Sequence, residues 1–275
     1  MTAGDVIVVD GNLTARQAAA FDGTDDYILA DAHAVARVAA NDTTGTYSAW
    51  IYVDTISGTK EILSVGDNDS VDQILEFVLI NNGILAALVT VGGVEQWRVT
   101  ATTDRLVAKT WTHVAVVQRG SGIPELYIDG QNITVTNSTS VDNTTWFDEL
   151  TNCDKFAIGV KESNNTHTSD FLGMISDVKY WNKALTAAEI AKDYNGEALA
   201  DDGTYLQLHL LDGDNGITDQ GLGADNGTLT GHAYLCGWGS EWSRRLETSG
   251  AVVADSIQTI PYERGRARTV IVKAA

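Results

Sequence analysis

Short β-rich runs separated by turn residues are the feature that most constrains how this chain can fold. Val, Ile, Tyr, Trp and Thr fill the runs, and Asn81-Asn82-Gly83 and Asp129-Gly130 are among the turns between them. Residues that tolerate positive φ favour tight hairpins between antiparallel strands. The pattern predicts an all-β, two-sheet antiparallel sandwich. Strands are expected at 47–53, 74–80, 83–91, 94–101, 111–119, 124–129, 156–161 and 172–182.

One helix is specified within this β-rich sequence. Thr186 and Glu189 have the spacing of a capping box, and Gly196 stands where a left-handed residue ends a helix. The segments 15–21 and 31–40 are rich in Ala and have helical propensity, but each is short and flanked by turn residues. For these two segments, helix and non-helix both remain open.

Four phrases, in this order, resemble the laminin-G-like (LamG) jelly rolls of the concanavalin A-like lectin/glucanase superfamily. They are FDGTDDYI (21–28), YSAWIYVD (47–54), WTHVAVVQRGSGIPELYIDGQ (111–131) and the segment 156–196. The resemblance covers about residues 18 to 197. It implies a jelly-roll sandwich whose closing strand is followed by a short helix. It also implies that Trp50 and Trp111 occupy buried core positions.

The segment 205–231 resembles one that usually precedes the FDG phrase, yet here it follows the helix. It either closes the sandwich from the other end, as in a circular permutant, or belongs to a neighbouring unit. We favour closure, because the terminal strands of such domains tend to lie side by side. The expected organisation is an N-terminal segment, a jelly roll with a closing strand, and an extended C-terminal basic arm. These pieces span 1–17, 18–236 (closing strand 204–212) and 237–275.

The charge of the chain limits the classes of partner that it is expected to bind. A formal net charge of −19 argues against nucleic acid, because such binding depends on Lys and Arg attracted to phosphate. Residues 1–17 lack the basic and apolar parts of a signal peptide, and no apolar run is long enough to insert into a membrane. Basic residues concentrate in the C-terminal arm, which we expect to anchor the protein to a capsid or tail protein. They are Arg244, Arg245, Arg264, Arg266, Arg268 and Lys273.

No catalytic residue is predicted. Related glucanases cluster carboxylates on one strand, where two of them divide the nucleophile and acid roles. The nearest candidate, 125–129, lacks the third carboxylate of that pattern, and no histidine lies in a metal-binding pair or beside a nucleophile signature. Cys153 and Cys236 are the only cysteines, and they fit either two thiols or one bridge. The sequence therefore predicts a protein that is not an enzyme.

Two kinds of binding site are expected instead. Calcium prefers several oxygen ligands, and loop residues could supply them if the closure brings the loops together, although such residues are also ordinary turn formers. The candidate calcium ligands are Asp25, Asp26, Asp219, Asp225 and Asn226. Sugars stack on exposed aromatic rings, although core packing is the alternative role for each ring. The candidate glycan-binding residues are Trp97, Trp146, Trp181 and Trp238.

These features favour a non-catalytic protein of a virion surface: a head decoration, spike or fibre subunit that contacts host-surface glycans and forms a homo-oligomer. The absence of a leader, the acidic body and the basic arm support this hypothesis. The alternative is a carbohydrate-binding adhesin module, located outside the cell or on its surface.

Overall fold

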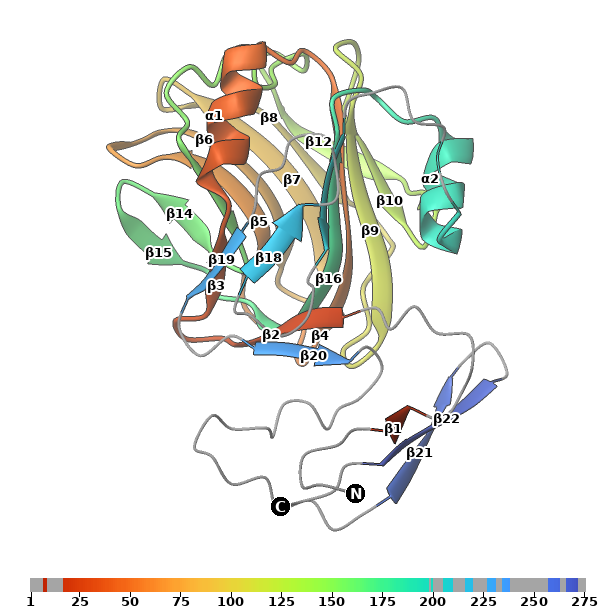
Figure 1. Cartoon of the computed structure of the whole chain (residues 1–275). Helices are drawn as coiled ribbons and strands as arrows, with labels where there is room; N and C mark the ends of the chain where they lie inside the picture. The colour runs from red at the N-terminus through yellow and green to blue at the C-terminus, as the bar shows by residue number, and fades with distance from the viewer. Residues whose placement is uncertain are drawn as a thin grey trace.

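The computed structural model describes residues 7–8, 17–197, 199, 205–209, 216–219, 227–230, 234–237, 257–262 and 266–271. Two large antiparallel sheets face each other, so the predicted sandwich is confirmed (Figure 1). Sheet 1 contains, side by side, β11 (Gln131–Asn132), β10 (Glu125–Ile128), β9 (Trp111–Gln118), β4 (Gly45–Val53) and β16 (Leu172–Trp181). On its free side β16 pairs first with β2 (Gln17–Asp22) and then with β17 (Tyr205–His209). Next to β2 lies β20 (Tyr234–Gly237).

Sheet 2 contains the longest consecutive hairpins of the chain. Its order is β19 (Gly227–Thr230), β3 (Tyr27–Leu29), β13 (Lys155–Ile158), β5 (Lys60–Asp67), β6 (Ser70–Ile80), β7 (Ile84–Val91), β8 (Val94–Ala101) and β12 (Val135–Ser140). One strand, β18 (Gly216–Asp219), pairs with β17 of sheet 1 and with β19 of sheet 2, and so joins the two sheets.

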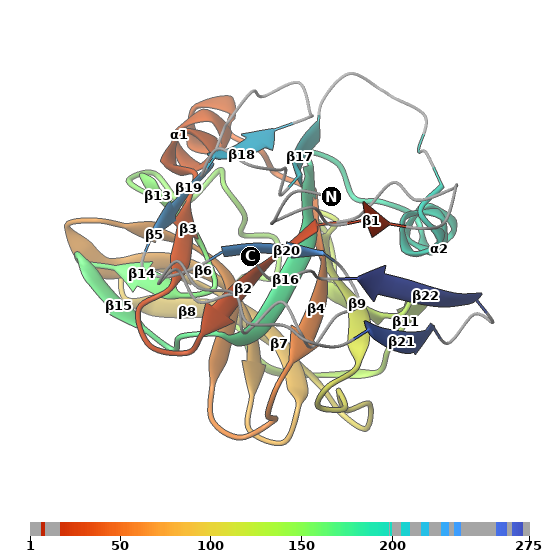
Figure 2. The same ribbon diagram turned by 60° about the horizontal axis from the view of Figure 1, so that its bottom comes forward.

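Two smaller β units complete the described chain. β14 (Lys161–Ser163) and β15 (Thr166–Thr168) form a hairpin that lies beside β5 in both views (Figures 1 and 2). β1 (Ile7–Val8), β22 (Arg266–Ile271) and β21 (Ile257–Tyr262) form a three-stranded sheet.

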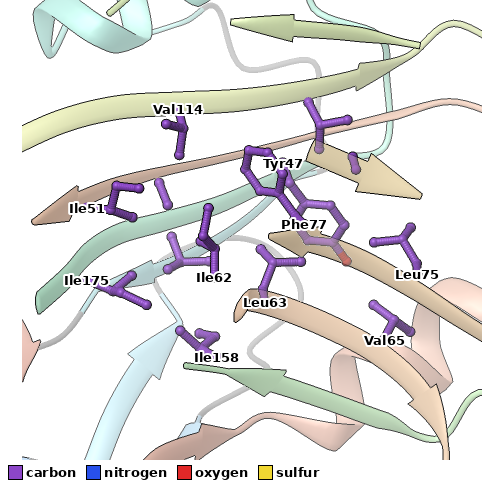
Figure 3. Packing of buried hydrophobic residues seen from close by; sticks show 14 of the residues in the cluster. Tyr47, Ile51, Ile62, Leu63, Val65, Leu75, Phe77, Val114, Ile158 and Ile175 are labelled. Atoms are coloured by element: carbon purple, nitrogen blue, oxygen red, sulfur yellow. The ribbon is translucent and has the colours of Figure 1, made fainter. Parts of the chain in front are cut away.

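The core lies between the facing sides of the two sheets. Alternate residues of β4, such as Tyr47 and Ile51, belong to the same core cluster as Phe77 of β6 and Leu63 and Val65 of β5 (Figure 3). Each of these side chains is buried, because successive strand residues point to opposite faces. Burial of apolar surface between the sheets is therefore the main force that holds the sandwich together.

The two helices have different roles. α1 (Asp31–Ala40) carries His33 and Ala34 into the core. α2 (Ala187–Asn195) packs on the outer face of sheet 1, where it covers an apolar cluster that includes Trp181. Its predicted capping box is confirmed. No helix of the described residues is long and apolar enough to cross a membrane.

The two Ala-rich segments differ in structure although their composition is similar. Residues 31–40 form α1, whereas most of 15–21 forms β2. β2 lies between β16 and β20, and backbone hydrogen bonds from both sides hold it extended. Strand pairing therefore overrides the helical propensity of Ala.

The resemblance implied that Trp50 and Trp111 are buried in the core, and this prediction is wrong. Tyr47, Ala49 and Ile51 of β4 face the core, so Trp50 points to the outer face of sheet 1. Trp111 lies on the same face, where its ring contacts Tyr52. Both tryptophans are half-buried.

Candidate functional site

The outer face of sheet 2 brings polar side chains of five neighbouring strands into one row. Ser64, Glu76, Leu88, Arg98 and Thr139 are cross-strand partners in β5, β6, β7, β8 and β12. Their sequence neighbours on the first four strands pack in the core, so the row points away from sheet 1. The row combines a hydroxyl at each end with a carboxylate and a guanidinium between them.

A second row runs beside the first and includes Glu61, Val78, Ala86, Thr100 and Thr136. Val78 and Ala86 form an apolar cluster with Leu88 of the first row, and none of the three is more than 4% exposed. These three apolar side chains are therefore covered, and a ligand on this face would meet the polar groups around them.

Two ion pairs fix the charges of this face. Lys161 of β14 donates from Nζ to Oε1 of Glu76 at 2.7 Å. Arg98 donates from Nε to both carboxylate oxygens of Glu95, at 3.0 and 2.9 Å, and Nη2 donates to the same carboxylate. The Thr139 hydroxyl also donates to Glu95. Burial alone raises the pKa of Glu95, but the hydrogen bonds from Arg98 and Thr139 outweigh it and lower that pKa.

The β14–β15 hairpin sits directly on the β5 end of this face. Ser64 donates from Oγ to the carbonyl of Val160 at 3.0 Å and accepts from the backbone N–H of Glu162 at 3.0 Å. A Cβ at Gly66 would lie 2.1 Å from the carbonyl oxygen of Glu162, so only glycine permits this approach. The hairpin positions Lys161 over Glu76 through these contacts.

Glu61 is fully buried under this layer. Among the described residues, neither carboxylate oxygen has a partner at hydrogen-bonding geometry. Burial raises the pKa of Glu61 well above its ordinary value of 4.5, and the adjacent charge of Glu76 adds to this rise. Lys161 and the backbone amide of Phe77 lower that pKa, but by less. Glu61 is therefore held towards its neutral, protonated form.

Glycosidases use two neighbouring carboxyl groups as acid and nucleophile, and Glu61 and Glu76 lie on neighbouring strands. Glu61 has no exposed surface, and Glu76 is 8% exposed and already bonded to Lys161. Neither carboxyl meets a substrate from solvent in this arrangement. What the face presents is a set of fixed donors and acceptors, which suits binding.

The predicted glycan-stacking tryptophans lie in the interior, so the prediction is wrong for three of them. Trp97 and Trp146 are fully buried and stack on each other with centroids 6.3 Å apart, and Trp97 donates from Nε1 to the carbonyl of Thr145. Trp181 is buried beneath α2. A sugar cannot stack on a ring whose faces are already packed. Trp238 lies outside the described residues.

Two of the predicted calcium ligands come together with a third carboxylate. Oxygens of Asp22, Asp25 and Asp26 lie within 4.8 Å of one another in the β2–β3 loop. Asp219 does not join them. Asp219 pairs with Leu208, which in turn pairs with Val178 of β16. Asp22 pairs with Leu172, which lies six residues from Val178 on the same strand. At about 3.3 Å per residue, this places Asp219 about 20 Å away. Asp225 and Asn226 lie outside the described residues.

A serine, a histidine and an aspartate also meet beneath α2, but they form a structural cluster. Asp193 accepts hydrogen bonds from Ser48 Oγ at 2.7 Å, His113 Nε2 at 3.0 Å and Lys179 Nζ at 2.6 Å. A catalytic triad needs the serine hydroxyl bonded to the histidine, whereas here both bond to the aspartate. All four side chains are buried, and the cluster fastens α2 to sheet 1.

Cys153 is a free, buried thiol, and burial raises its pKa to about 12. Of the predicted anchoring residues, Arg266 and Arg268 belong to β22. Arg244, Arg245 and Arg264 lie outside the described residues.

Sequence reasoning missed the charged row of sheet 2. The signal was present in the predicted strands 74–80 and 94–101, where Glu76 and Arg98 interrupt apolar side chains. In a strand with one face in the core, such positions mark the outer face. The cross-strand register that aligns them cannot be obtained from either strand alone.

Comparison with known families identifies the fold class. A laminin-G model of the concanavalin A-like lectin/glucanase superfamily matches residues 22–191. The match spans more than half of the chain, and the chain belongs to this superfamily. No curated protein sequence matches the chain significantly.

Several solved structures share this architecture at low sequence identity. The CBM40 domain of the Ruminococcus gnavus IT-sialidase is 16% identical over 65% of this chain and 96% of its own, with a TM-score of 0.54. A Bacteroides ovatus protein described as a candidate carbohydrate-binding protein is 18% identical over 82% of this chain and 60% of its own (TM-score 0.56). The leech intramolecular trans-sialidase is 16% identical over 74% of this chain and 30% of its own (TM-score 0.55). At such identities, these similarities establish the fold alone.

Proposed function

We propose that this chain is a non-catalytic carbohydrate-binding module whose glycan lies on the outer face of sheet 2. The observation that carries the proposal is the two ion pairs of this face, Lys161–Glu76 and Arg98–Glu95, in which the side chains of Lys161, Arg98 and Glu95 stay 25–34% exposed. The structural similarity to the CBM40 domain and to the Bacteroides protein supports this choice of ligand class.

The polar groups of the face match the hydroxyl groups of a sugar. Sugar hydroxyls donate and accept hydrogen bonds. Carboxylate and guanidinium groups make stronger hydrogen bonds than neutral groups do. Because the ion pair already holds Arg98 and Glu95 in place, ordering them costs little on binding.

The test is glycan-array binding followed by titration of the best ligand against an Arg98→Gln variant. We expect the variant to bind about ten- to a hundredfold more weakly, because a hydrogen bond to a charged group contributes about 1.5–3 kcal/mol. The matched control is Lys192→Gln, which removes the same charge from an exposed position of α2 on the other sheet. Equal affinity of the two variants would place the glycan elsewhere.

Calcium is a second proposal, for the β2–β3 loop alone. Asp22, Asp25 and Asp26 offer the carboxylate oxygens that calcium prefers. A bound ion stabilises the folded state by about 2.7 kcal/mol when free calcium is a hundred times Kd. We therefore expect calcium to raise the melting temperature of the protein, and Asp25→Asn to abolish the rise. An unchanged melting temperature in millimolar calcium contradicts the proposal.

We propose that the protein acts on the surface of a virion. In that setting the arm 237–275 binds a capsid or tail protein and the sandwich contacts host glycans. An adhesin module of a cell surface remains the alternative. Both are predictions from the sequence, and the glycan-binding proposal is common to them.

A further inference from the structure

The charges of the proposed binding face balance within the face itself. Its two permanent cations are Lys161 and Arg98, and each is in contact with a carboxylate, Glu76 and Glu95 respectively. Glu61, the remaining acidic group of the two rows, is fully buried and held towards its neutral form. Within these two rows, each cation therefore has a carboxylate partner.

We infer that this face selects uncharged glycans over glycans that carry a carboxylate, such as sialylated ones. The inference rests on the proposed glycan-binding function and names the ligand class of that same site.

An anionic sugar would have to compete for Arg98 with Glu95. Glu95 occupies Nε and Nη2 of the guanidinium and also accepts from Thr139. Three hydrogen bonds to one carboxylate make a rigid, charge-assisted pair, and separating it would leave Glu95 without its partner. The carboxylate of a sugar would thus gain one ion pair only by breaking another.

An anionic sugar meets a similar obstacle at the other end of the row. Lys161 Nζ lies 2.7 Å from Glu76, and the hairpin contacts of Ser64 hold β14 in that position. A carboxylate placed near this pair meets Glu76 at close range, and like charges repel. The net charge of −19 adds a weaker, salt-screened repulsion at longer distance.

An uncharged sugar needs no such exchange. The bonds to Glu95 use Nε and Nη2 of Arg98, which leaves Nη1 as a donor towards a hydroxyl. The carboxylate oxygens of Glu95, whose side chain is 25% exposed, accept from hydroxyl groups while Arg98 stays in place. Neutral hydroxyls therefore add hydrogen bonds to the existing ion pairs and do not replace them.

The test compares matched pairs on a glycan array and in solution: each neutral oligosaccharide and its sialylated form, bound to the full chain at low salt. We expect each neutral form to bind at least tenfold more tightly than its sialylated partner. Equal or tighter binding of the sialylated forms overturns the inference but leaves the glycan-binding proposal intact. Absence of binding to every glycan overturns both.

A charge variant tests the cause of the selectivity. Glu95→Gln removes the carboxylate that neutralises Arg98, so the ratio of sialylated to neutral affinity should rise about tenfold above that of the unmodified protein. The control is Glu197→Gln, an exposed position after α2 that changes the net charge equally. An unchanged ratio in Glu95→Gln, or an equal rise in both variants, contradicts the assignment of selectivity to this pair.

Discussion

Asp193→Asn is expected to destabilise the protein by about 3–5 kcal/mol, the cost of removing one partner from a buried ion pair. The Lys179 ammonium lies 2.6 Å from Asp193, and the Lys179 side chain is only 11% exposed, so in the variant the charge lacks its partner in a largely buried place. Burial alone raises the pKa of Asp193, but Lys179 and His113 outweigh this effect and hold that pKa well below its ordinary value. The carboxylate is therefore ionised in the folded state.

The measurement is the free energy of unfolding from urea titration at neutral pH, with Glu197→Gln as the control that removes one exposed carboxylate next to the same helix. We expect the control to change stability by less than about 0.5 kcal/mol. Since the pKa of Asp193 is depressed, its contribution is present above the pKa of the unfolded chain and is lost as pH falls through the folded pKa. A loss in Asp193→Asn no larger than in the control contradicts the role of this cluster.

How much of the fold the sequence predicts depends on whether the deciding contacts are local. The capping box of Thr186 and Glu189 lies within one helical turn, and it was predicted correctly. The strand at 17–22 depends on hydrogen bonds to β16 and β20, which are distant in the chain, and its Ala-rich composition left helix and non-helix open. Local sequence therefore predicts the ends of a helix better than it predicts a strand whose conformation depends on hydrogen bonds to neighbouring strands.

The candidate site was harder to predict for the same reason. Whether a tryptophan is core or surface depends on which face of its strand meets the other sheet, and a single strand does not specify this. Trp97 packs inward, whereas Arg98 next to it points outward. The carboxylates of the FDGTDD loop are four residues apart at most, and their clustering could be predicted locally. Asp219 could be excluded only once the pairing of β17 with β16 was known.

Glu61→Gln is expected to change the pH dependence of stability more than any other single substitution on sheet 2. The folded protein holds Glu61 protonated above pH 4.5, its ordinary pKa, whereas the unfolded chain releases the proton. The unfolded state then binds fewer protons than the folded state, so the native protein loses stability as pH rises. The loss is about 1.4 kcal/mol for each pH unit between the unfolded and folded pKa values of this group.

Glutamine has nearly the same shape and does not titrate, so the variant lacks this loss. Its amide donors bring a constant cost of about 1–3 kcal/mol if they stay unpaired in the buried site, but that cost does not vary with pH. The stability of the variant relative to the native protein should therefore rise steadily from pH 5 upward. Urea titrations of the native protein, Glu61→Gln and the exposed control Glu197→Gln at several pH values give this difference directly. A difference that stays constant across the range means that Glu61 is ionised in the folded state, and the face then carries a net negative charge that strengthens its discrimination against anionic sugars.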